Sequence, residues 1–121
     1  MTQQKSLNSK IEVNQISQLM LEKKAVDIII IDVRKLTTLT DFFIICTSES
    51  EPQTKAITDH INDRMKENGL KAWHTEGYNN KEWVLIDFVN IVVHIFSKES
   101  REYYDFERLW ADGKLLPIKD N

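Results

Sequence analysis

The sequence predicts a single α/β domain, a sandwich in which helices flank a mixed sheet of roughly five strands. Two features of the chain support this fold class. Short apolar runs rich in β-branched residues alternate with segments whose apolar residues recur at helical spacing. No repeat and no Gly-, Ser- or Pro-rich linker interrupts the 121 residues, a length close to the commonest domain size. We therefore expect one domain over residues 9–111, with a loose N-terminus over 1–8 and a loose C-terminal tail over 112–121.

The first part of the predicted domain contains one helix and two strands. Ser9 and Glu12 fit a capping box, and apolar residues at helical spacing extend this helix to about residue 24. Residues 26–33 and 42–47 are short, continuous apolar runs. Such runs are typical of strands that are covered on both faces.

The central helix carries clear signals at both of its ends. Ser50 and Gln53 form a second capping box, and Pro52 lies in the first turn, where its missing N–H costs nothing. Gly69 supplies a left-handed C-terminal cap. A third strand is expected over residues 71–75.

Residues 83–88 and 91–96 predict an antiparallel hairpin with the two-residue connection Val89-Asn90. Val89 suits the positive φ of such a turn poorly. If Phe88 opposes Ile91, one face of the hairpin is wholly apolar and belongs to the core. The opposite face is mixed and carries the side chains of Trp83, Leu85, Asp87, Val92, His94 and Phe96. A final helix from about 98 to 110 completes the order α-β-β-α-β-β-β-α.

Charge and composition restrict the partners and the compartment. The net charge is −3, and no dense Lys/Arg cluster occurs, which disfavours dominant contact with nucleic acid and suits a basic protein partner. The single cysteine, Cys46, indicates a reducing compartment. Residues 1–10 lack the apolar segment of a secretory signal, and the apolar run 28–31 is far too short to span a membrane. We expect a cytoplasmic protein without membrane contact.

Catalytic patterns do not occur in the sequence. The three glycines are too far apart for a phosphate-binding loop. Asp27 and Asp32 are five residues apart and are expected on opposite faces of their strand, so they do not converge on a metal. Cys46 lies in an apolar run and is expected to be an inert buried thiol. The histidines fall on three different predicted elements: His60, His74 and His94. We therefore expect no catalytic residue, no metal and no cofactor, and a protein that is not an enzyme.

Two residues on the mixed face of the hairpin have alternative interpretations. Trp83 is either a core tryptophan or the centre of an exposed apolar patch, as is common in protein interfaces. The aromatic residues of the last helix decide between these alternatives, because they can cover the same face. His94 is either structural or a partner contact, whereas His60 and His74 are expected to be surface residues without a functional role.

The chain as a whole resembles the ribosomal silencing factor family, also called Iojap-like. The resemblance extends from about residue 16 to residue 110 and consists of many short motifs in the correct order. These are DI (27–28), IDV (31–33), TDFFIICTS (40–48), Gln53 with AI (56–57), EG (76–77), WVLIDF (83–88), VVHIF (92–96), REYY (101–104) and ERLW (107–110). It implies a nucleotidyltransferase-like α/β fold without the catalytic machinery.

The resemblance also implies a function and a partner. A member binds ribosomal protein L-fourteen on the large ribosomal subunit, sterically blocks association with the small subunit and represses translation under nutrient limitation. Members also form homodimers off the ribosome. The family's contact surface corresponds to Trp83, with Glu76, Asp87, His94 and Tyr104 as weaker candidates.

One departure and two alternative functions accompany this interpretation. The family usually has Gly-Asp between the hairpin strands, where this chain has Val89-Asn90. The implied fold alone suggests a nucleotide-binding or residual nucleotidyltransferase protein as an alternative. A further alternative is an assembly factor that binds rRNA directly, which the acidic charge disfavours.

Overall fold

The computed structural model describes residues 2–116 and residue 118, and these form an α/β domain with one mixed, six-stranded sheet. The elements are α1 (Thr2–Glu22), β1 (Val26–Asp32), β2 (Phe42–Ser48), α2 (Glu51–Glu67), β3 (His74–Glu76), β4 (Trp83–Asp87), β5 (Ile91–Ser97), α3 (Lys98–Tyr104), α4 (Phe106–Leu109) and β6 (Lys114–Leu116). The strand order is β3-β4-β5-β2-β1-β6. Strands β2 and β5 are parallel, and all other neighbours in this sheet are antiparallel.

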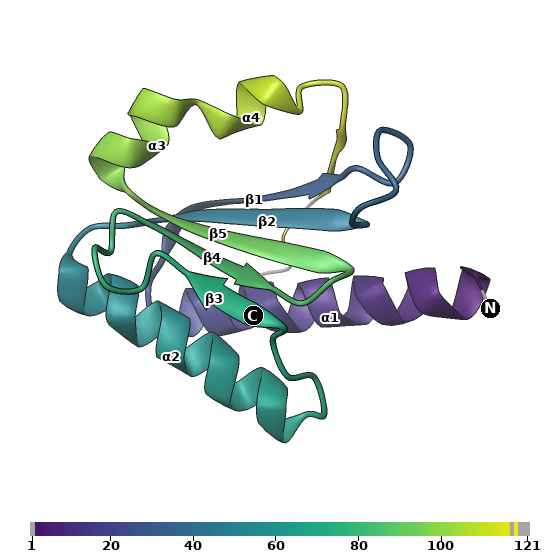
Figure 1. Ribbon diagram of the computed structural model, residues 1–121, viewed down its shortest axis with the longest axis horizontal. Helices are drawn as coiled ribbons and strands as arrows, with labels where there is room; N and C mark the ends of the chain where they lie inside the picture. Colours follow the sequence, from purple (N-terminus) through teal and green to yellow (C-terminus); the bar gives the residue numbers. More distant parts are fainter. Residues whose placement is uncertain (1, 117, 119–121) are drawn as a thin grey trace.

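The two faces of the sheet are covered to different extents. Helices α1 and α2 lie along one face, and the short helices α3 and α4 lie over the other (Figure 1). The larger core fills the space beneath α1 and α2, and it includes Ile16, Met20, Ile57, Ile61, Met65, Val84, Ile86, Val93 and Ile95. The predicted apolar face of the hairpin is therefore confirmed as a core face. Within the described residues, no helix has the length and apolar character needed to cross a membrane.

Helix α2 begins and ends where the sequence predicts. The Ser50 hydroxyl accepts a hydrogen bond from the backbone N–H of Gln53 at 3.2 Å. The Gln53 side-chain oxygen accepts from the backbone N–H of Glu49 at 2.7 Å, whereas a capping box would use the N–H of the next residue, Ser50. At the other end, Gly69 has a φ of 91° and Leu70 donates its N–H to the Met65 carbonyl. Both ends of α2 are thus satisfied by the local sequence.

Helix α1 begins earlier than the sequence predicts. It starts at Thr2, so the expected capping box at Ser9 is wrong and most of the segment expected to be loose is helical. Ser9 is buried inside the helix, and its hydroxyl donates to an Asp41 carboxylate oxygen at 3.3 Å. A tertiary partner therefore takes the hydroxyl that a capping motif would use locally.

The ends of the sheet also differ from the prediction. The sixth strand, β6, lies within the segment expected to be a loose tail and pairs with β1 through Ile30, Ile31 and Asp32. This pairing satisfies the outer backbone groups of β1, which would otherwise form an open edge. The third strand covers His74–Glu76 instead of residues 71–75 and forms the opposite edge of the sheet.

The hairpin of β4 and β5 has the predicted register and a strained turn. Phe88 donates its N–H to the Ile91 carbonyl at 2.8 Å. Val89 has a φ of 75°, and the Asn90 N–H donates to the Phe88 carbonyl at 3.0 Å. A hydrogen bond between Phe88 and Asn90 that encloses one central residue with a positive φ fits the classic γ-turn, which is rare and strained. The Asp87 carboxylate accepts the Val89 N–H at 2.7 Å and so stabilises the turn.

The predicted single last helix is in fact two short helices. Asp105 adopts a left-handed conformation with a φ of 47° and ends α3. Aspartate tolerates this conformation better than most residues do. The Arg101 guanidinium bridges the break by donating to both carboxylate oxygens of Glu107, at 2.9 and 3.1 Å, and to the Thr47 hydroxyl at 2.8 Å. This bridge ties α3 to α4 and to the sheet, so that Phe106 packs toward the sheet.

Candidate functional site

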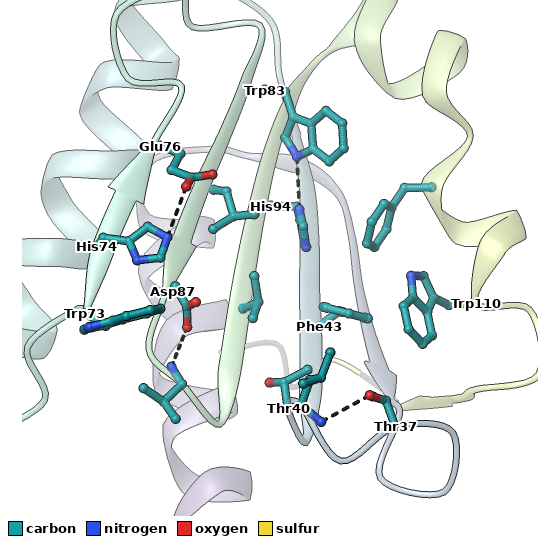
Figure 2. Close-up of a pocket in the computed structure, with 15 residues that line it drawn as sticks. Thr37, Thr40, Phe43, Trp73, His74, Glu76, Trp83, Asp87, His94 and Trp110 are labelled. Carbon is teal, nitrogen blue, oxygen red and sulfur yellow. Dashed lines mark hydrogen bonds and ion pairs between the residues drawn. The ribbon is translucent and has the colours of Figure 1, made fainter.

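A groove of about 560 Å³ lies over the face of the sheet that α3 and α4 cover incompletely. Strands β3, β4 and β5 form its floor, and α4 and the loop before β2 form its walls (Figure 2). Most of the lining is apolar. It comprises Thr37, Leu39, Thr40, Phe43, Trp73, His74, Glu76, Trp83, Leu85, Asp87, Val89, Val92, His94, Phe106 and Trp110.

Trp83 lies at one end of the groove and is half-buried. Its ring is 4.9 Å from the ring of Phe96 and 4.8 Å from that of Tyr104, measured between centroids. The indole N–H donates a hydrogen bond to Nδ1 of His94 at 3.0 Å, which Figure 2 shows as a dashed line. The last helices therefore support the indole from one side without sealing it.

His94 is buried beneath the groove, with 2% of its surface exposed. Burial lowers its pKa to about 3, so the imidazole is neutral near pH 7. Its ring lies 5.4 Å from Phe43 and 4.3 Å from Phe106 between centroids. Of its two predicted roles, the structural one is present in this packing.

Two carboxylates lie along the side of the groove that β3 and β4 form. Glu76 is exposed, and one of its oxygens is 3.3 Å from Nε2 of His74. Asp87 uses one oxygen to hold the turn at Val89. These groups give the groove an acidic edge.

The sequence-derived candidates are brought together around Trp83. Trp83, Glu76, Asp87 and His94 all line the groove. Tyr104 lies outside the lining, and its exposed ring packs against the indole.

Sequence reasoning missed two of the most exposed apolar residues in the groove. Trp73 is 71% exposed and Leu39 is 86% exposed. Both lie outside the strands, where no periodic pattern marks a residue as accessible. The signal available was the residue type itself, since each is a large apolar side chain outside the longer apolar runs.

The remaining reactive groups in the part of the chain that the structure describes do not form a catalytic arrangement. Among the described residues, no cluster of three His, Cys, Asp or Glu side chains could hold a metal ion. Cys46 is fully buried as predicted, and burial raises the pKa of its thiol to about 12. His60 contacts Glu22 at 2.7 Å on the helical side of the domain, away from the groove lining.

Comparisons with known proteins agree on one family. A family model described as "Ribosomal silencing factor during starvation" matches residues 6–121. The ribosomal silencing factor RsfS of Bacillus subtilis is 39% identical over 97 residues, which are 80% of this chain and 82% of that protein. The chloroplastic protein Iojap of Zea mays is 37% identical over 98 residues, which are 81% of this chain and 42% of that protein.

Solved structures show the same similarity. The crystal structure of a protein from Chromobacterium violaceum matches with a TM-score of 0.79 and 33% identity, over 91% of this chain and 92% of that chain. A protein from Bacillus halodurans matches with a TM-score of 0.76 and 33% identity, over 86% of this chain and 95% of that chain.

Proposed function

The chain belongs to the ribosomal silencing factor family, and on that premise we propose that it docks on ribosomal protein L-fourteen through the groove around Trp83. Membership makes it a non-enzymatic factor that binds the large ribosomal subunit. The observation that supports the groove as the docking surface is the half-buried indole in an apolar, incompletely covered face. A large aromatic side chain that is partly desolvated in an apolar surface is typical of a binding hot spot.

The proposed mechanism is steric. A docked protein occupies a volume that the small subunit needs, so it prevents subunit association and represses translation when nutrients are limited. The factor needs only an interface of standard size for this, about 800 Å² on each partner. No reacting group is required at the surface.

Charge favours a basic partner at this groove. The chain carries a net charge of −3, and Glu76 and Asp87 lie in the groove lining. A basic ribosomal protein is attracted to such a surface, which accelerates encounter, whereas acidic proteins are repelled. Because the carboxylates are few and lie beside apolar walls, we expect burial of apolar surface to supply most of the affinity.

The proposal has three further parts. The fold is nucleotidyltransferase-like and serves here as a scaffold without activity. The protein acts in the cytoplasm, in keeping with a buried free thiol at Cys46. Off the ribosome, two copies pair through exposed apolar surface, such as that of Trp73 and Leu39, because a soluble protein rarely leaves a large patch uncovered.

The direct test is co-sedimentation with purified large subunits, followed by addition of small subunits. We expect the protein to sediment with large subunits and to keep the small subunits free. Leu39→Glu places a charge on a groove residue that is 86% exposed, so it leaves the fold intact and weakens binding at least tenfold.

Tyr103→Glu provides the matched control. Tyr103 is 82% exposed and lies outside the groove lining, so this variant should bind within about twofold of the unmodified protein. Equal binding by both variants would exclude the groove as the docking surface. Formation of whole ribosomes in the presence of bound protein would exclude the steric mechanism.

A further inference from the structure

The inner surface of the groove contains two buried polar atoms that have no hydrogen-bond partner among the described residues. They are Nε2 of His94, whose residue is 2% exposed, and the hydroxyl of Thr40, whose residue is 6% exposed. Both residues belong to the groove lining. A buried polar group without a partner costs free energy, so two of them beside one groove require an explanation.

The hydrogen bond from Trp83 determines which His94 nitrogen carries the proton. The indole N–H can only donate, so Nδ1 of His94 must accept it. The proton of the neutral ring is then on Nε2. Trp83 thus holds an N–H donor in a fixed orientation, and the imidazole lies between the indole and Phe43 in Figure 2.

The surroundings define what can pair with this donor. A cation is disfavoured because it would face the N–H proton, and a carboxylate is disfavoured because Glu76 and Asp87 belong to the same lining. A neutral oxygen, as in a carbonyl or hydroxyl group, meets neither penalty. The aromatic walls provided by Phe43, Phe106 and Trp110 further require that this oxygen be carried on a largely apolar segment.

We propose that Nε2–H of His94 donates a hydrogen bond to a neutral oxygen on an apolar segment of the docked ribosomal protein. This assignment rests on the proposed function and adds the chemistry by which the groove selects its occupant. A segment that presents only apolar groups would leave the donor unpaired, so the bond contributes to specificity. The Thr40 hydroxyl offers a second, weaker site for the same segment.

Docking requires a small movement of the groove wall. Nε2 is buried from solvent in the free protein, so the oxygen reaches it only when a neighbouring side chain shifts. Phe106 is the first residue of α4, and Trp110 directly follows this helix. Helix α4 has only four residues, and no side chain caps its first turn. We expect the side chains at this helix to shift on docking while the Arg101–Glu107 bridge keeps the helix itself in place.

The test uses the full chain, labelled with ¹⁵N in its histidines, and purified ribosomal protein L-fourteen. In the free protein, ¹⁵N spectra should show His94 protonated on Nε2, and finding the proton on Nδ1 would overturn the assignment. On saturation with L-fourteen, the Nε2–H proton should shift downfield as it gains an acceptor. Binding without any change in this resonance would refute the hydrogen bond and leave the docking proposal intact. Absence of binding would refute both.

Three variants separate the two roles of His94, which are to donate from Nε2–H and to accept from the Trp83 indole at Nδ1. His94→Phe removes both roles. His94→Asn can keep an oxygen near the position of Nδ1 to accept from the indole, but it has no donor at the position of Nε2. We expect both to weaken L-fourteen binding about tenfold, and Thr40→Val to weaken it about threefold. If His94→Asn bound as tightly as the unmodified protein, the loss in His94→Phe would come from a misplaced indole, and the proposal would fail.

Discussion

The turn between β4 and β5 makes a sharp prediction about stability. Val89 adopts a φ of 75°, a conformation that costs an L-amino acid with a β-carbon about 1–2 kcal/mol. Replacing it with glycine removes this cost but increases the conformational freedom of the unfolded chain, which offsets roughly 0.5–1 kcal/mol. Val89 is 55% exposed, so little packing is lost. The net expectation is a gain in the free energy of unfolding of about 0.5–1 kcal/mol for Val89→Gly.

Urea denaturation followed by circular dichroism measures this gain. With an m-value of about 2 kcal/mol per molar urea, the midpoint should rise by about 0.3–0.5 M at an unchanged slope. Asn90→Gly is the matched control, because Asn90 lies in the same turn without a positive φ. Glycine there relieves no strain and should lower the unfolding free energy by about 0.5 kcal/mol. A midpoint for Val89→Gly at or below that of the unmodified protein would refute the strain argument.

Three further predictions concern the groove and its support. Trp83→Ala should weaken binding to the large subunit by about 2 kcal/mol or more in co-sedimentation, with circular dichroism as the check on folding, and an unchanged affinity would remove the indole from the interface. Because burial lowers the pKa of His94 to about 3, the unfolded chain binds a proton below pH 6.5 that the folded chain does not, so stability should fall with decreasing pH. Urea titrations between pH 6.5 and 4.5 should show a loss of up to about 1.4 kcal/mol per pH unit that His94→Phe lacks; equal slopes would contradict the burial argument. Arg101→Met removes the bridge to Glu107 and Thr47 and should lower the unfolding free energy by about 2 kcal/mol in urea, whereas no change would show that the bridge does not hold the last helices in place.

Local patterns in the sequence predict the fold well wherever the local signal and the tertiary structure agree. The caps of α2 and the register of the hairpin depend on neighbouring residues, and the structure confirms both. The apparent capping box at Ser9 is misleading, because the Ser9 hydroxyl bonds the carboxylate of Asp41, 32 residues away, and does not cap the helix. Strand β6 was missed for a related reason, since three residues carry too little pattern and form a strand only by pairing with β1.

The candidate site was predictable in its centre and less so at its walls. Alternation along the hairpin places Trp83 and His94 on one face, because strand periodicity fixes which side chains share a side. Whether the last helix covers that face depends on the break at Asp105, which no periodic pattern reveals. The break directs Phe106 onto His94 and leaves Trp83 half-buried, so both alternatives for the mixed face are partly realised.

Several features that lower the stability of the isolated domain occur together around the groove. Val89 is the one β-branched residue with a positive φ among the described residues, and it lies in the lining. The same lining includes an unpaired donor on His94 and the exposed side chains of Trp73 and Leu39. The stability of the isolated fold would favour, first, glycine in place of Val89; second, a partner for the His94 donor; and third, polar residues in place of Trp73 and Leu39. A partner that covers the apolar groups and pairs the donor offsets the second and third of these costs on binding, which supports our proposal that the groove serves recognition.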